Sequence, residues 1–128
     1  MARILLAEDD GPVRDFVRRA LEMTGHEVIP VHDGGEALER LTSPLESFDL
    51  LLSDIRMPVV DGIALALHAA RDRPELPVLL MSGYAEHRER AYGLDALIRG
   101  IIQKPFTLEA IQRSVAEALA PETKVRTA

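Results

Sequence analysis

The sequence contains no cysteine and no tryptophan, and only 4% of its residues are aromatic. Without cysteine there is no disulfide framework and no thiolate metal site. No apolar run approaches the roughly 18 residues that cross a bilayer, and the carboxylates of Glu8 to Asp10 come too early for a signal peptide. Positive charge is also scarce, with 15 Lys and Arg against 21 Asp and Glu, which argues against direct nucleic-acid binding. We therefore expect a cytoplasmic protein that contacts neither membrane nor nucleic acid.

The chain is long enough for one domain with a sizeable core, since 47% of its 128 residues are hydrophobic. Five short apolar runs alternate with helical patterns, and the runs are continuous, as is typical of strands covered on both faces. They are Ile4–Ala7, Val28–Val31, Leu50–Ser53, Val78–Met81 and Gly100–Gln103. Because crossovers are right-handed, this alternation predicts a doubly wound α/β fold, (βα)5, with a five-stranded parallel sheet and five helices.

Capping residues mark several helix ends. Asp33 followed by Glu36 is typical of a capping box that opens a helix at Gly34. Thr107 can cap the last helix and Gly25 can end the first. We expect the domain to span residues 1–120 and residues 121–128 to form a short, flexible tail.

Polar side chains follow four of the five predicted strands. They are Glu8, Asp9, Asp54, Ser82 and Lys104. Each residue alone is more often a turn or capping residue. Their joint occurrence at the carboxyl ends of parallel strands, where ligands bind in open α/β sheets, favours a functional site.

The chemistry of these side chains indicates phosphoryl transfer. Three neighbouring carboxylates repel one another, and a divalent cation relieves that repulsion. Ligands that are all oxygen suit Mg²⁺. A metal beside the Lys104 ammonium and the Ser82 hydroxyl would stabilise phosphoryl oxygens. One carboxylate remains as nucleophile, and we predict that it is Asp54, at the centre of the sheet.

Four segments resemble the signatures of the receiver domain of bacterial two-component response regulators, the CheY-like superfamily. They are LLAEDD, LLLSDIRMPVVDG, LLMSG and QKPF. The resemblance covers Ala2 to about Leu119 and implies a flavodoxin-like fold with strand order 2-1-3-4-5.

The resemblance also implies roles for the site residues. Asp54 is the phosphoacceptor, and Mg²⁺ is bound by Asp9, Asp54 and the backbone carbonyl of Arg56. Glu8 is expected to act through a metal-bound water. The side chains of Arg56 and Tyr84 would lie at the pocket mouth, where they could tune the access of water.

A phosphorylation switch is implied as well. Ser82 matches the switch Ser/Thr of the family, and the Lys104–Pro105 bond is expected to be cis. Ile101 stands where an aromatic residue is usual, and an aliphatic side chain cannot reproduce the aromatic ring swing. We expect a partner surface made by a fourth helix around residues 86–92, the fifth strand and the fifth helix, with Ile101 at its centre.

As a receiver, the chain would be no enzyme beyond its own phosphorylation and dephosphorylation. The phosphoryl group would come from a histidine kinase or a histidine phosphotransfer protein. With so few residues after the last helix, we expect output through protein binding, as a monomer or weak dimer. The sequence is most similar to CpdR-type single-domain regulators, which implies an adaptor for a ClpX-type protease. The alternatives are a CheY-like motor regulator, a phosphorelay intermediate or a phosphate sink.

An aspartate-nucleophile phosphatase would use the same functional groups. Such enzymes need a D-x-D pair after the first strand and a cap domain. Here Asp54 follows the third strand and Arg56 stands two residues later, so this alternative is disfavoured.

Overall fold

The structure, a computed structural model of the chain, describes residues 1–83, 92–94 and 96–121. Its five parallel strands form one sheet with the order β2-β1-β3-β4-β5. The strands are β1 (Arg3–Ala7), β2 (Glu27–Val31), β3 (Leu50–Asp54), β4 (Val78–Ser82) and β5 (Gly100–Gln103). The predicted α/β fold and strand order are confirmed, and every strand lies within one residue of its predicted bounds.

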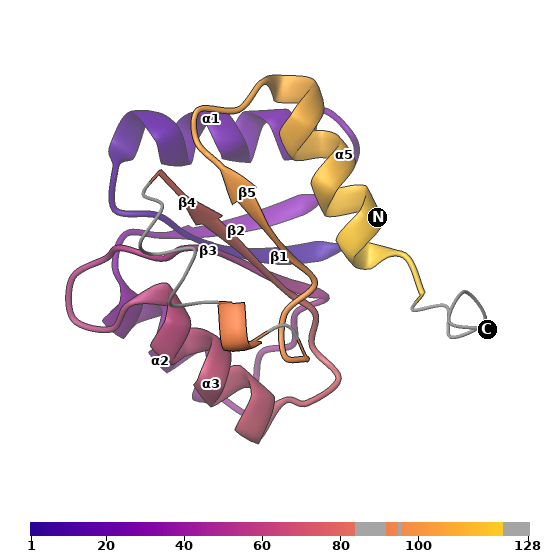
Figure 1. Cartoon of the computed structure of the whole chain (residues 1–128). Coiled ribbons are helices and arrows are strands. Elements are labelled where there is room, and N and C mark those ends of the chain that lie inside the picture. The colour runs from indigo at the N-terminus through magenta and orange to yellow at the C-terminus, as the bar shows by residue number, and fades with distance from the viewer. Residues whose placement is uncertain (84–91, 95, 122–128) are drawn as a thin grey trace.

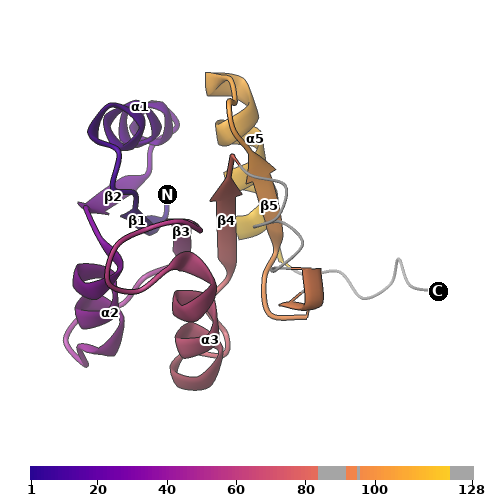
Figure 2. The same ribbon diagram turned by 60° about the vertical axis from the view of Figure 1, so that its left-hand side comes forward.

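Helices cover both faces of the sheet (Figures 1 and 2). Helices α1 (Gly11–Glu22) and α5 (Leu108–Leu119) lie on one face, and α2 (Gly34–Thr42) and α3 (Gly62–Asp72) on the other. A short 3-10 turn, η1 (Tyr92–Leu94), precedes β5. The described residues thus hold four of the five predicted α-helices; residues 86–91 of the expected fourth helix, and the tail after residue 121, fall outside the described part of the chain. None of the helices described is long and apolar enough for a membrane span.

The two predicted N-caps, Asp33 and Thr107, are confirmed. The carboxylate of Asp33 accepts a hydrogen bond from the backbone of Glu36 at 2.8 Å, and Thr107 caps α5. Helix α1 ends at Glu22, and Gly25, with φ 91°, lies in the turn that leads to β2. Local sequence signals therefore mark where α2 and α5 begin, whereas the C-cap of α1 is Met23 and not the predicted Gly25.

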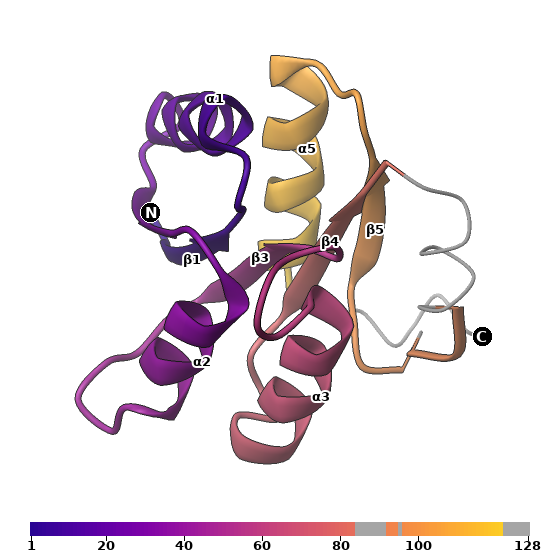
Figure 3. The same cartoon turned by 90° about the vertical axis from the view of Figure 1, so that its left-hand side faces the viewer.

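The core forms an apolar layer on each face of the sheet. On β1, Leu5 and Ala7 pack toward α2 and α3, whereas Ile4 and Leu6 pack toward α1 and α5, and all four are fully buried. Figure 3 shows these helices above and below the strands. Because both faces are covered, the central strands carry continuous apolar runs, such as Leu50–Leu52 in β3 and Val78–Met81 in β4, before their polar last residues. Rigid strands then hold the residues that follow them.

Candidate functional site

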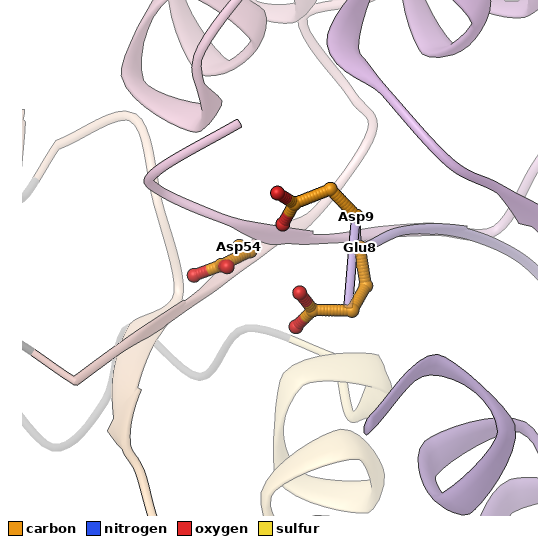
Figure 4. Close-up of side chains that lie close together, drawn as sticks. All are labelled: Glu8, Asp9 and Asp54. Atoms are coloured by element: carbon orange, nitrogen blue, oxygen red, sulfur yellow. The ribbon is translucent and has the colours of Figure 1, made fainter. Parts of the chain in front are cut away.

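Three carboxylates meet at the carboxyl ends of β1 and β3. These strands are neighbours, and the register that pairs Ala7 with Ser53 brings Glu8 and Asp9 beside Asp54. One oxygen from each carboxylate lies within 4.8 Å of the others. Figure 4 shows the three side chains pointing to one region. The structure thus brings together the acidic residues that the sequence singled out.

Glu8 is the buried member of this cluster. Its side chain is 0% exposed, although it is a carboxylate. Oε1 accepts from Nζ of Lys104 at 2.9 Å, and Oε2 accepts from the backbone N–H of Asp10 at 3.1 Å. Burial raises the pKa of Glu8 to about 7, and the charge of Asp54 adds to the rise, against the hydrogen bond from Lys104. The buried Glu8 carboxyl group is therefore protonated more readily than an exposed glutamate.

Lys104 links the two central carboxylates. Its Nζ lies 3.1 Å from Oδ2 of Asp54 and also contacts Glu8. Burial works to lower the pKa of Lys104, but the hydrogen bond with Glu8 and the charge of Asp54 outweigh it, so the pKa is raised. The ammonium stays charged and partly neutralises the cluster. The Lys104–Pro105 bond is cis, as expected.

A pocket of about 480 Å³ opens above the cluster. It is lined by Glu8, Asp9, Asp10, Asp54, Arg56, Gly83 and Lys104. Ser82 is buried at the end of β4, next to Gly83, and its carbonyl accepts from the backbone N–H of Lys104 at 2.9 Å. The pocket is large enough for a phosphoryl group and a hydrated cation beside Asp54.

Of the predicted switch residues, Ile101 lies within the described part of the chain and Tyr84 does not. Ile101 is half-buried and packs against the core on the face of α2 and α3. Tyr84 lies outside the described residues, as do residues 86–91 of the expected fourth helix.

The loop from β3 to α3 is closed tightly behind Asp54. The hydroxyl of Ser53 donates to the carbonyl of Asp54 at 2.8 Å, and the N–H of Gly62 donates to the carbonyl of Ile55, also at 2.8 Å. A Cβ at Gly62 would lie 2.3 Å from that Asp54 carbonyl oxygen. Only glycine therefore lets α3 begin so close to Asp54.

Sequence reasoning missed two supports of the site. Asp10 belongs to the acidic run Glu8–Asp10, and its carboxylate also caps α1 by accepting a hydrogen bond from the N–H of Val13 at 3.2 Å. An aspartate just before Gly-Pro is a helix-start signal that could have indicated this. Arg14 donates to the carbonyl of Glu8 at 2.8 Å, which no local pattern indicates.

The donor set fits Mg²⁺. The three clustered groups of the described chain all offer carboxylate oxygens, the ligand type that Mg²⁺ prefers. An ion there would be held by one or two carboxylates and would keep several waters, for which the pocket has room.

The family model described as "Response regulator receiver domain" matches residues 4–116. CpdR, a response regulator receiver protein of Brucella abortus, is 38% identical over 119 residues, which cover 93% of this chain and 98% of that protein. The response regulator MprA of Mycobacterium ulcerans is 37% identical over 123 residues, which cover 96% of this chain. The chain spans only about half of MprA, 52% of its length.

A solved structure agrees with these matches. A CheY-like receiver domain protein from Methanospirillum hungatei is 30% identical, with a TM-score of 0.83 over 93% of this chain and 94% of that one. Receiver domains are regulatory domains of two-component signalling, and the cluster of Glu8, Asp9 and Asp54 is typical of their Mg²⁺ site. The fold, the acidic cluster and the family match agree, and the chain belongs to the response regulator receiver domain family.

Proposed function

We propose that Asp54 accepts a phosphoryl group from a histidine kinase or a histidine phosphotransfer protein, and that this changes the binding of a second protein. The observation that carries the proposal is the contact of Lys104 with Asp54 beside the acidic cluster. A cationic donor and a metal site next to one carboxylate are what phosphoryl transfer to that carboxylate needs. The proposal places the domain at residues 1–120 and the protein in the cytoplasm.

The proposed roles follow from the contacts. An oxygen of Asp54 attacks phosphorus, the P–O bond forms, and the P–N bond breaks with its electron pair leaving on the donor imidazole. Bound Mg²⁺ would neutralise charge on the phosphoryl oxygens. Lys104 moves from its contact with Asp54 Oδ2 to a phosphoryl oxygen, and the Ser82 hydroxyl donates to another. The chain would catalyse only its own phosphorylation and dephosphorylation.

Glu8 supports the metal indirectly in this scheme. Both of its carboxylate oxygens already accept hydrogen bonds, from Lys104 and from the Asp10 backbone. This supports a role through a metal-bound water, with Asp9, Asp54 and the Arg56 carbonyl as direct ligands.

Labelling with a small acyl phosphate tests the proposal. Acetyl phosphate should modify wild type only when Mg²⁺ is present, and mass spectrometry should place the phosphoryl group on Asp54. Asp54→Asn should abolish labelling. Asp49→Asn, whose carboxylate accepts from the backbone of Arg3 at the other end of β3, should keep it. Label on any other residue contradicts the assignment.

For the output we propose a CpdR-like role, an adaptor that presents partners to a ClpX-type protease when unphosphorylated. The support is 38% identity over 98% of CpdR, together with the aliphatic Ile101 packed against the core. The competing candidates are a CheY-like motor regulator, a phosphorelay intermediate and a phosphate sink. Binding of Asp54→Ala to the protease partner, lost on phosphorylation of wild type, supports the adaptor. Binding by the beryllofluoride-bound form alone contradicts it.

A further inference from the structure

Val59 has an unusual backbone for its residue type. Its φ is 74°, and it is the non-glycine residue with positive φ in the described chain. The N–H of Val60 donates to the carbonyl of Pro58 at 2.9 Å, which closes a strained three-residue γ-turn around Val59. For a β-branched residue, this region is a true outlier. The side chain is also 80% exposed, so core packing does not compensate for the strain.

Neighbouring residues hold the turn from behind. The N–H of Gly34, at the start of α2, donates to the carbonyl of Pro58 at 3.2 Å. Val60 packs against the core next to α2 and α3. Figure 3 shows the loop passing beside α2 before it enters α3. The backbone is thus braced without help from the Val59 side chain, and glycine or asparagine would adopt the same turn with less strain.

The turn belongs to the same closed loop as the phosphorylation site. Val59 is three residues from Gly62, so chain length keeps the two within about 11 Å, and Gly62 packs directly on the carbonyl of Asp54. A protein interface of ordinary size covers about 800 Å² per partner, a disc of about 16 Å radius. An interface of this radius, centred on the pocket, is wide enough to include Val59 when the partner extends over the loop from β3 to α3.

We infer that Val59 is a specificity contact for the protein that donates the phosphoryl group. This inference rests on the proposed phosphorylation of Asp54. The partner is a protein that carries a phosphohistidine with an apolar patch beside it, and Val59 packs on that patch. In the free chain, Val59 has a strained backbone and methyl groups exposed to water, and both are unfavourable. Burial of these methyl groups against the partner gives a physical reason for a valine at this position. Val59 acts on recognition and leaves the transfer step itself unchanged.

Two phosphodonors separate recognition from chemistry. The protein donor is the purified, autophosphorylated histidine kinase from the source organism that phosphorylates wild type fastest. The small donor is acetyl phosphate with Mg²⁺. Val59→Gly removes both side chain and strain, whereas Val59→Ala removes the two γ-methyl groups and keeps the strained backbone. Leu45→Ala, at a residue 92% exposed in the loop before β3, is the matched control.

The inference predicts a selective loss. At sub-saturating chain concentration, transfer from the kinase to both Val59 variants should fall about fivefold or more, the loss typical of a significant interface residue. For both Val59 variants, the maximal rate of transfer from the kinase and the rate of labelling by acetyl phosphate should stay within about twofold of wild type. The rate of transfer from the kinase to Leu45→Ala should also stay within about twofold of wild type.

Three results would overturn it. Equal rates of transfer from the kinase to wild type and all variants would show that Val59 makes no contact with the kinase. An equal loss with both donors means that Val59 acts through the shape of the site. An equal loss in Leu45→Ala means that any exposed apolar residue suffices. Failure of acetyl phosphate to label Asp54 in wild type is a separate result, which removes the proposed function and this inference with it.

Discussion

Gly34 and Val60 are in such close contact that no side chain fits between them: a Cβ at Gly34 would lie 1.6 Å from the carbonyl oxygen of Val60. Gly34→Ala should therefore lower the free energy of unfolding by about 2 kcal/mol or more, because backbone must move to admit the methyl group. Gly35→Ala is the control, since the nearest atoms to its Cβ would belong to side chains, a methyl group of Val59 at 3.0 Å and Oδ1 of Asp33 at 3.4 Å. Urea denaturation measures both, and equal stability of the two variants would show that the contact is looser than described.

Arg73 fastens the loop between α2 and β3. Its guanidinium donates to the carbonyls of Leu41, Ser43 and Glu46 at 2.8 to 2.9 Å. A lysine cannot reproduce this planar fork, so Arg73→Lys should lower the free energy of unfolding by about 2 kcal/mol. Arg71→Lys, in an exposed pair with Asp72, should leave it close to the wild-type value, because exposed ion pairs contribute little to stability. Similar losses of stability in Arg73→Lys and Arg71→Lys would show that Arg73 does not stabilise this loop.

Mg²⁺ should stabilise the folded chain by about 1.4 kcal/mol at ten times its dissociation constant. Asp9→Asn should abolish this gain, and it should raise stability without metal because one of three clustered charges is removed. Asp10→Asn, which keeps a good helix cap, should retain most of the Mg²⁺ effect. Thermal melts with and without Mg²⁺ decide the matter. Equal Mg²⁺ stabilisation of wild type and Asp9→Asn contradicts the site.

His26 should make stability depend on pH. Its Nδ1 accepts from the backbone N–H of Ala2 at 3.1 Å, which requires the neutral ring. Burial, and then the charge of the N-terminal ammonium, lower the pKa of His26 below its ordinary 6.5. The unfolded chain therefore binds this proton more readily, and stability present above pH 6.5 is lost as the pH falls through the folded pKa.

Replacement of the ring tests this sign. His26→Gln keeps an acceptor but cannot titrate, so its stability should fall less between pH 7 and pH 5 than that of wild type. Urea denaturation across this range gives the comparison. Parallel curves for the two proteins would show that other groups cause the acid sensitivity.

Sequence patterns sufficed for the sheet and for the identity of the acidic cluster. Continuous apolar runs mark buried parallel strands, and the residues after them share one edge by geometry alone, which is why Asp9 and Asp54 could be paired in advance. The ion pair of Glu8 with Lys104 could not be predicted, because it depends on how far each side chain reaches. The positive φ of Val59 could not be predicted either, because a valine does not indicate a turn with positive φ.

Glu8 and Lys104 are 96 residues apart in sequence, yet their side chains touch. This separation makes the domain suited to fragment complementation. A cut in the connection 43–49, between α2 and β3, would leave Glu8 and Asp9 on one piece and Asp54 and Lys104 on the other. Neither piece alone would hold the three carboxylates of the cluster. Recovery of Mg²⁺ binding when the pieces are mixed would then report directly that β1 has paired with β3 again.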